Sequence, residues 1–151
     1  MTSRAAEASS AQFALWQRKT VKATKDARRV LVAHPDPSVG ESLVVLLCLK
    51  AFQAKHAIDV AATRSILDQW RPYAIFLDTR IGGLDDDAFV REIDLLKGNE
   101  HGLLIAMSSF MPEESVERLK EVGFDGHCRR PCPMWQMADL LEGFFSCDLE
   151  R

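Results

Sequence analysis

The 151-residue sequence is short of the features that membrane, secreted and nucleic-acid-binding proteins share. No apolar stretch approaches the length of a membrane span, and the N-terminus has no apolar core followed by a small-residue cleavage site. The formal net charge of -3 gives no field that would attract nucleic acid. We therefore expect a cytoplasmic protein that binds neither nucleic acid nor membrane.

Cysteine is also scarce, and the 4 cysteines are too scattered for a disulfide framework. Cys128 and Cys132 have three residues between them, whereas the usual metal-binding knuckle has two. Free thiols in a reducing cytosol are the expected state. Internal repeats and low-complexity tracts are absent, and 151 residues are enough for one domain with a buried core.

Short apolar runs alternate with amphipathic stretches along most of the chain. The expected strands are 30–33, 57–61, 74–77, 103–107 and 124–128, and the expected helices are 37–52, 63–70, 85–96, 112–122 and 133–145. Strand and helix thus alternate five times with short connections. This pattern predicts an α/β fold of the flavodoxin-like type, a doubly wound sheet of five parallel strands with helices on both faces.

The composition divides the chain into three parts. Residues 1–28 are rich in Ala, Ser, Lys and Arg, and we interpret them as an N-terminal leader, partly helical or disordered, outside the main fold. The leader carries one apolar cluster, made of Phe13, Leu15 and Trp16. The main domain is expected at 29–146, and 147–151 form a short tail that leaves no room for an output domain.

The helix expected from Pro37 has a second apolar face. Val45, Cys48, Leu49 and Phe52 stand where a surface helix usually carries charge. The leader's apolar cluster could cover this face, and so could a second copy of the protein. The alternative is that these side chains are singly exposed and need no cover.

Polar residues stand where four of the five expected strands end. In the flavodoxin-like winding the first, third, fourth and fifth strands end together. The residues at these ends are His34, Pro35, Asp36, Asp78, Ser108 and Arg130. An acid, a hydroxyl and a guanidinium suit the handling of a phosphoryl group, as nucleophile, acceptor-oxygen partner and cation. The sequence therefore predicts a shallow pocket for phosphoryl chemistry at this edge.

From about residue 29 to 145 the chain resembles the receiver domain of bacterial two-component response regulators. Leu77–Asp85 is similar to that family's apolar residue, phosphoacceptor aspartate and following loop. Asp78 takes the phosphoacceptor position, and Gly82 stands in the place of a proline. The resemblance supports the expected fold and implies a signalling role.

The resemblance also gives roles to residues at the other strand ends. Ser108 takes the place of the switch hydroxyl, and the small residue Ser109 follows it. Arg130 stands where the family has a lysine, before the matching Pro131. His127 takes the position of the switch aromatic.

The largest departure from the family concerns the metal site. Family members end the first strand with two adjacent acids that hold Mg²⁺, and these positions here are His34 and Pro35. Imidazole is a poor substitute for carboxylate toward Mg²⁺, and proline offers only a carbonyl. Asp36 comes one position later and is expected to cap the helix that begins at Pro37.

The resemblance therefore implies a single-domain, degenerate receiver-like protein without a cofactor, acting as an interaction module in two-component or phosphorelay signalling. The alternative is a working response regulator phosphorylated on Asp78, with weak Mg²⁺ binding through Asp36 and Asp78. No enzyme activity is expected beyond receiver-type phosphotransfer to Asp78. Because the metal-holding acids are missing, we expect slow phosphorylation or none.

The histidines leave further alternatives open. His34 could form an ion pair with Asp78, or it could be a neutral side chain that touches solvent. A transition-metal site formed by His34, Asp78 and His127 is another alternative. His56 and His101 are expected to be surface loop residues.

Two other kinds of protein share part of the pattern, and both are disfavoured. Phosphatases of the haloacid dehalogenase type need a second Asp two residues after the nucleophile, where this chain has Arg80. Flavodoxin-like nucleotide or flavin binders need a phosphate-cradling loop after the first strand. This chain has His-Pro-Asp-Pro there.

The resemblance implies partners such as a histidine kinase, a phosphotransfer protein or a downstream effector. Receivers commonly bind them through the fourth helix, fifth strand and fifth helix, where this chain has Phe110, Met111, His127 and Trp135. Trp135 lies among polar residues, so it is either an interface anchor or a partly buried packing residue. A homodimer through the first helix and leader, or through the last helix, is also open.

Overall fold

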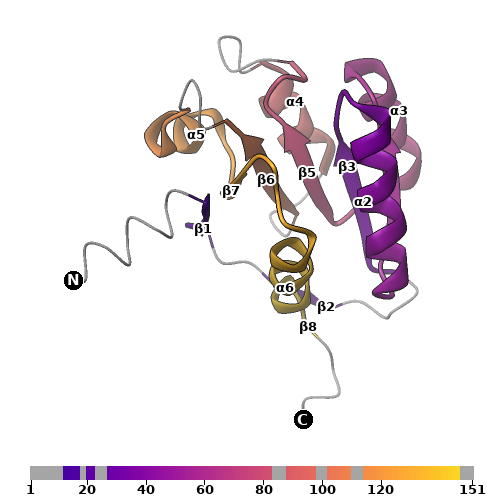
Figure 1. Ribbon diagram of the computed structural model, residues 1–151. Coiled ribbons are helices and arrows are strands. Elements are labelled where there is room, and N and C mark those ends of the chain that lie inside the picture. The colour runs from indigo at the N-terminus through magenta and orange to yellow at the C-terminus, as the bar shows by residue number, and fades with distance from the viewer. Residues whose placement is uncertain are drawn as a thin grey trace, which may run out of the picture.

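The computed structural model describes residues 12–17, 20–22, 27–82, 88–97, 102–109 and 114–146. A parallel sheet forms the centre of the molecule, as the sequence predicts (Figure 1). Its parallel strands are β3 (Arg29–Ala33), β4 (Gln53–Ala57), β5 (Ala74–Asp78), β6 (Leu103–Ser108) and β7 (Gly126–Arg129). The order across the sheet is β1-β7-β6-β5-β3-β4, and β1 (Phe13–Leu15) is antiparallel to β7.

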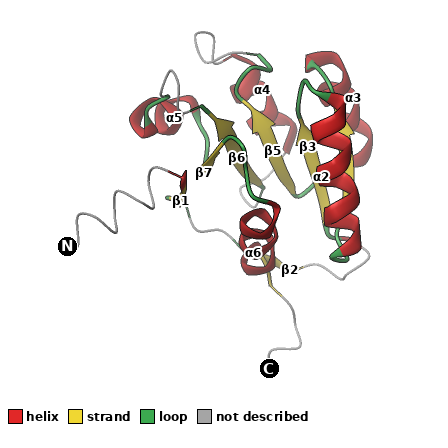
Figure 2. Cartoon of the chain, in the orientation of Figure 1, coloured by secondary structure: helices red, strands yellow, loops and turns green. Residues whose placement is uncertain are grey.

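Helices cover both faces of this sheet (Figure 2). They are α2 (Pro37–Leu49), α3 (Val60–Trp70), α4 (Ala88–Lys97), α5 (Val116–Val122) and α6 (Met134–Phe144). In the central strands β3, β5 and β6, alternate residues point to opposite faces, and both sets are largely apolar and buried. One core lies between the sheet and the pair α2 and α6, and the other lies beneath α3, α4 and α5.

The start of α2 agrees with the sequence. Oδ1 of Asp36 accepts a hydrogen bond from the backbone N–H of Ser38 at 2.9 Å, and Pro37 is the first helical residue. The second apolar face of α2 stays largely open, since Leu49 is 77% exposed. Phe52 is buried instead, because the helix ends before it and the chain turns at Ala51, which has a φ of 74°.

The second strand lies earlier than the sequence predicts. The expected strand at 57–61 is wrong, because β4 ends at Ala57 and α3 begins at Val60. Asp59, and not Thr63, caps this helix: its Oδ1 accepts from the backbone N–H of Ala62 at 2.9 Å. β4 is an edge strand with few apolar residues, so its sequence carries a weak strand signal.

The interpretation of residues 1–28 as a leader outside the main fold is wrong for part of that segment. Residues 13–15 form β1, and β2 (Val21–Lys22) pairs with β8 (Phe145–Ser146) in a small second sheet. Phe13 and Leu15 pack against the core beneath α6, so they do not cover the exposed face of α2. Three apolar residues are too short a run to predict a strand, because the pairing partner supplies most of the stabilisation.

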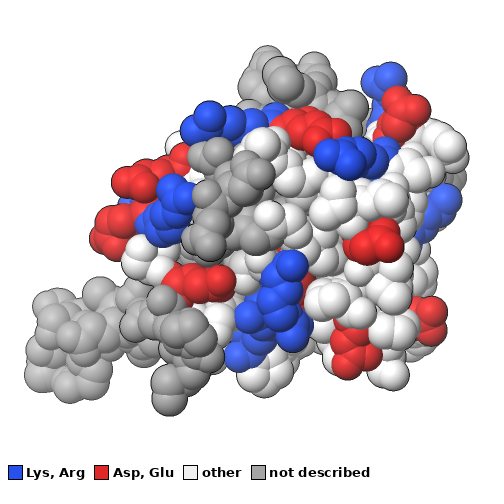
Figure 3. All heavy atoms as spheres, turned by 90° about the horizontal axis from the view of Figure 1, so that it is seen from above, with Lys and Arg blue, Asp and Glu red and all other residues white. Residues whose placement is uncertain are grey.

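None of the described helices is long and apolar enough to cross a membrane. Side chains of both charge signs are interspersed on the face that Figure 3 shows, with uncharged surface between them.

Candidate functional site

The site lies where β3, β5, β6 and β7 end. His34 follows β3, Asp78 is the last residue of β5, and Arg130 follows β7. The structure brings these three side chains together, as the sequence predicts. Ser108, the last residue of β6, belongs to a neighbouring set of contacts described below.

The carboxylate of Asp78 is completely buried and is bonded to two guanidinium groups. Oδ1 accepts from the backbone N–H of Arg80 at 2.8 Å, from its Nε at 2.9 Å, and from Nη1 of Arg130 at 3.0 Å. Oδ2 accepts from Nη2 of Arg80 at 2.7 Å. Both carboxylate oxygens are therefore engaged by positive charge.

Arg130 is the more firmly fixed of the two cations. Its Nη1 also donates to the carbonyl of Met107 at 2.6 Å and to Oγ1 of Thr79 at 3.2 Å. Its side chain is 21% exposed, whereas that of Arg80 is 53% exposed. Arg130 therefore ties the end of β7 to β5 and β6, while Arg80 covers Asp78 from the solvent side.

His34 contacts the same carboxylate as a neutral ring. Nδ1 accepts from the backbone N–H of Asp36 at 3.0 Å, so the ring proton is on Nε2, which lies 3.4 Å from Oδ2 of Asp78. Burial lowers the pKa of His34 more than Asp78 raises it, and the cations Arg80 and Arg130 lower it further. His34 lies beside Asp78, as the ion-pair interpretation requires, but its ring is neutral, as in the other interpretation. The side chain is buried, so it is not the solvent-touching residue of that second interpretation.

The backbone of His34 is fixed by the neighbouring edge strand. Its N–H donates to the carbonyl of Ala57 at 2.9 Å, and Nε2 of His56 bonds to its carbonyl at 2.8 Å. A Cβ added at Gly40 would collide with the His56 ring, so a larger residue there would displace this ring from its place beside His34. The expectation that His56 is a surface loop residue is therefore wrong, because it lies in β4 and positions His34. His101 lies outside the described residues.

The carboxylates of this site do not fit Mg²⁺. Asp36 is used as the helix cap, and both oxygens of Asp78 are bonded to guanidinium groups. Among the residues that the structure describes, no group of three or more His, Cys, Asp or Glu side chains is placed to hold a metal ion. The alternative site of His34, Asp78 and His127 is accordingly not formed. Positive charge from the chain itself stands beside Asp78.

The predicted switch residues form a second, buried cluster. Oγ of Ser108 lies 3.2 Å from Nδ1 of His127 and accepts from Nη1 of Arg129 at 3.2 Å. All three side chains are buried. The ring of His127 is covered by Trp16, with 5.7 Å between the ring centroids. The switch-aromatic position is therefore occupied by a buried histidine under a residue of the N-terminal segment.

Arg129 and Glu114 connect this cluster to the Asp78 site. Nη1 of Arg129 donates to the carbonyl of Glu114 at 2.6 Å and to that of Ser109 at 3.0 Å. Oε1 of Glu114 accepts from the backbone N–H of Ser109 and from Oγ1 of Thr79, each at 2.8 Å. Since Arg130 also bonds Thr79, the hydrogen bonds run from one cluster to the other.

A cavity of about 390 Å³ opens beside the site. Its lining is His34, Asp36, Val39, Leu43, Arg80, Met107, Arg130, Pro131 and Cys132. A hydrogen bond with Cys128, followed by burial, raises the pKa of Cys132, so this thiol stays protonated. The cavity is therefore edged by guanidinium groups and a neutral thiol.

Sequence reasoning missed Arg80, Arg129 and Glu114. In the sequence, Arg80 stands where a phosphatase would need an acid, and a cation two residues after the buried Asp78 is also a usable signal of an ion pair. Arg129 precedes Arg130 in a pair that reads as surface charge, yet it is buried. Glu114 is separated from Thr79 by 35 residues, and no local pattern marks their contact.

Of the aromatic residues predicted to form an interface, the structure describes Trp135 but not Phe110. Trp135 is 62% exposed on α6, as an interface anchor requires. Phe110 and Met111 lie outside the described residues.

The unequal exposure of the two guanidinium groups gives a stability prediction. Arg130→Met should lower the free energy of unfolding by about 3 kcal/mol, because it leaves part of a buried ion pair without its partner. Arg80→Met should cost about 1 kcal/mol, because solvent screens this more exposed pair. Urea unfolding at neutral pH measures both losses. Equal losses in the two variants would contradict the inference that the ion pair of Arg130 contributes more to stability than that of Arg80.

The neutral state of His34 gives a prediction for pH. Its pKa is lowered from 6.5 in the folded chain, so the unfolded chain takes up a proton first as the pH falls. His34 should therefore reduce the free energy of unfolding between about pH 7 and pH 5. His34→Gln removes this contribution, so the stability advantage of the wild type over the variant should shrink as the pH falls. An advantage that grows instead would mean a charged His34 paired with Asp78.

Comparisons with known proteins agree on the architecture. No protein-family model matches the chain, and no curated protein sequence does. Among solved structures, CheY4 of Vibrio cholerae, a chemotaxis protein, superposes with a TM-score of 0.65 at 17% identity, covering 78% of this chain and 98% of that one. A CheY-like receiver domain from Methylobacillus flagellatus gives 0.64 at 18% identity, covering 78% and 98%.

A third similar structure is the receiver domain of Ssk1 of Saccharomyces cerevisiae, solved in a complex with the histidine phosphotransfer protein Ypd1. Its TM-score is 0.63 at 13% identity, covering 77% of this chain and 87% of that chain. These likenesses extend over nearly the whole of each receiver domain. The protein therefore has the receiver-domain fold of response regulators.

Proposed function

We propose that the protein is a degenerate receiver, an interaction module of two-component or phosphorelay signalling that does not use Mg²⁺-dependent phosphotransfer. The observation that carries the proposal is the buried carboxylate of Asp78 beneath Arg80 and Arg130. A receiver fold with an aspartate at the end of β5 supports the signalling role. The contacts of that aspartate argue against a rapid phosphoacceptor.

Phosphotransfer to Asp78 would need one carboxylate oxygen free for in-line attack. Oδ1 accepts three hydrogen bonds, and Oδ2 accepts one from Arg80 and faces His34. Arg80 would have to leave its bidentate pairing before a phosphodonor could reach the carboxylate. Breaking that pairing exposes a charge that the fold otherwise neutralises, so it opposes the reaction.

A separate argument, based on the ligands that Mg²⁺ needs, also opposes Mg²⁺-dependent phosphotransfer. Mg²⁺ requires a near-octahedral set of hard oxygen ligands, and His34 and Pro35 do not supply them. Asp36 would have to give up its cap to take part. The two guanidinium groups neutralise Asp78 permanently, whereas an exchangeable ion would come and go with its concentration.

Signalling proteins are the partners that this function requires. The Ssk1 receiver domain was crystallised with a histidine phosphotransfer protein, which supports a partner of that class for this chain. A histidine kinase and a downstream effector are the other classes of signalling partner that we propose. Trp135 provides an exposed aromatic anchor on α6, and the open apolar face of α2 offers a second surface, through which a homodimer could also form.

Treatment with acetyl phosphate, followed by intact-mass measurement, tests the proposal. The wild type should gain no phosphoryl group, with or without Mg²⁺. A variant with His34→Asp, Pro35→Asp and Arg80→Ala restores the acid pair and frees the carboxylate. It should gain one phosphoryl group in the presence of Mg²⁺ only, at a rate at least on the order of 100-fold above the detection limit that bounds the wild type.

Asp78→Asn in the restored background is the matched control, and it should abolish the mass gain. A rapid, Mg²⁺-dependent gain of one phosphoryl group at Asp78 of the wild type would overturn the proposal. The protein would then be a working phosphoacceptor, which is the alternative that its sequence leaves open.

A further inference from the structure

The outer edge of β7 is occupied by an extended segment of the same chain. The pairing is antiparallel, and its register sets Phe13 opposite Cys128, Ala14 opposite His127 and Leu15 opposite Gly126. Beyond the paired residues, Nε2 of Gln12 donates to the carbonyl of Arg129 at 3.1 Å. At the other end the backbone N–H groups of Trp16 and Gln17 donate to the carbonyl of Asp125 at 3.0 and 3.1 Å.

Gly126 shows that β7 is shaped for a strand at this edge. A Cβ at this position would lie 2.6 Å from the carbonyl oxygen of Ala14 and 3.0 Å from Cδ1 of Leu15. The first contact is with backbone, which cannot rotate out of the way. Absence of a side chain at 126 is therefore a condition for close approach of the extended segment.

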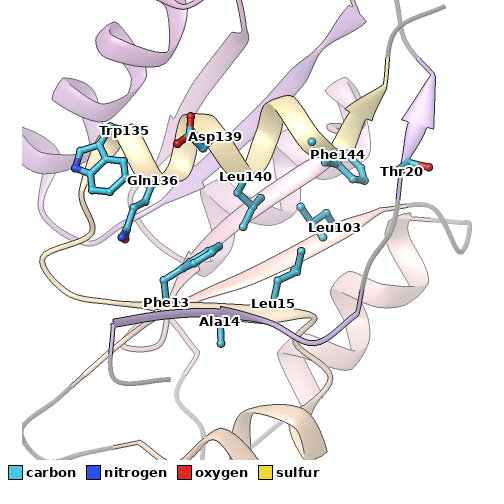
Figure 4. A pocket seen from close by; sticks show the side chains of 11 residues that line it. Phe13, Ala14, Leu15, Thr20, Leu103, Trp135, Gln136, Asp139, Leu140 and Phe144 are labelled. Atoms are coloured by element: carbon cyan, nitrogen blue, oxygen red, sulfur yellow. The ribbon is translucent and has the colours of Figure 1, made fainter. Parts of the chain in front are cut away.

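The two faces of the segment enter different environments. Phe13 and Leu15 point toward α6, while Ala14 points away from it (Figure 4). On the other face, the indole Nε1 of Trp16 donates to the carbonyl of Phe124 at 2.8 Å, and its ring lies over His127. The site thus accepts an apolar residue, a small residue, a second apolar residue and then an indole.

The segment fills its site only in part. A groove of about 660 Å³ remains between β1 and α6, lined largely by apolar side chains that include Leu103, Leu140 and Phe144 (Figure 4). Phe13, Leu15 and Trp16 stay half-buried, so each gains only part of the free energy of full burial. Three paired residues with incomplete burial are at the low end of local stability, and such a strand can be exchanged.

We propose that the edge of β7 is a strand-binding site for an extended segment of a partner protein, with the order apolar, small, apolar, aromatic. Residues 12–17 occupy it within the chain, and a partner segment of the same chemistry replaces them. Main-chain pairing with β7 supplies affinity, while the groove beneath α6 and the carbonyl of Phe124 select the side chains. This inference does not depend on the phosphorylation state of Asp78.

A synthetic peptide with the sequence of residues 12–17 and a fluorescent label tests the site by anisotropy with the full-length protein. Phe13→Ser with Trp16→Ala weakens the chain's own strand, because the two anchors are lost while β7 is unchanged. The peptide should bind this variant at least tenfold more tightly than the wild type, since it no longer competes with a tethered copy. Adding Gly126→Ala should remove most of the binding.

Two controls separate strand binding from general apolar attraction. A peptide with the same composition in scrambled order should bind at least tenfold more weakly. A peptide that carries Trp16→Ala should also bind at least tenfold more weakly, and this control leaves the protein unaltered. Far-UV circular dichroism establishes that each protein variant remains folded.

Failure of the peptide to bind the folded double variant would overturn the proposal. Equal binding of the native and scrambled peptides would do so as well. Concentration-dependent dimerisation of the wild type that Gly126→Ala abolishes would assign the edge to a second copy of this chain and not to a different partner.

Discussion

The buried charge of Asp78 is the constraint on which the rest of the site depends. A carboxylate taken out of water without a partner costs several kcal/mol, so the fold must supply positive charge at the end of β5. It does so with Arg80 from the following turn and Arg130 from the end of β7. Because Arg130 also bonds the carbonyl of Met107, neutralising one acid joins three strands of the sheet.

The source of the positive charge decides what the site can do. A bound metal ion is exchangeable, and its open coordination positions can take up a phosphoryl group. Guanidinium groups are part of the chain and have no such positions. Their hydrogen bonds engage both oxygens of Asp78 and add no site for a phosphoryl group. Arg80 is half exposed and could move, but the pairing it would leave is the one that neutralises the carboxylate. The same cations thus stabilise the site and oppose its reaction.

The sequence predicts the strands that carry the site better than it predicts the side-chain contacts within the site. Apolar runs mark β5 and β6 because strands buried on both faces have nothing but apolar residues, and these runs place Asp78 and Ser108 correctly. The pairing of Arg80 with Asp78 depends on side-chain conformations in a turn, which follow no period. The burial of Arg129 depends on carbonyls from distant segments, and β1 depends on a partner strand more than 100 residues away.

β7 contacts both the Asp78 site and the N-terminal segment. Its C-terminal end supplies Arg129 and Arg130, and its outer edge carries the N-terminal segment. The carbonyl of Arg129 receives Gln12, while its guanidinium bonds Ser108 and the backbone of Glu114. A strand at this edge is therefore one residue away from Arg130, one of the two cations that neutralise Asp78, and the Trp16 ring contacts the His127 ring beside Ser108. The N-terminal segment and one of the two cations that hold Asp78 are therefore positioned by the same short strand.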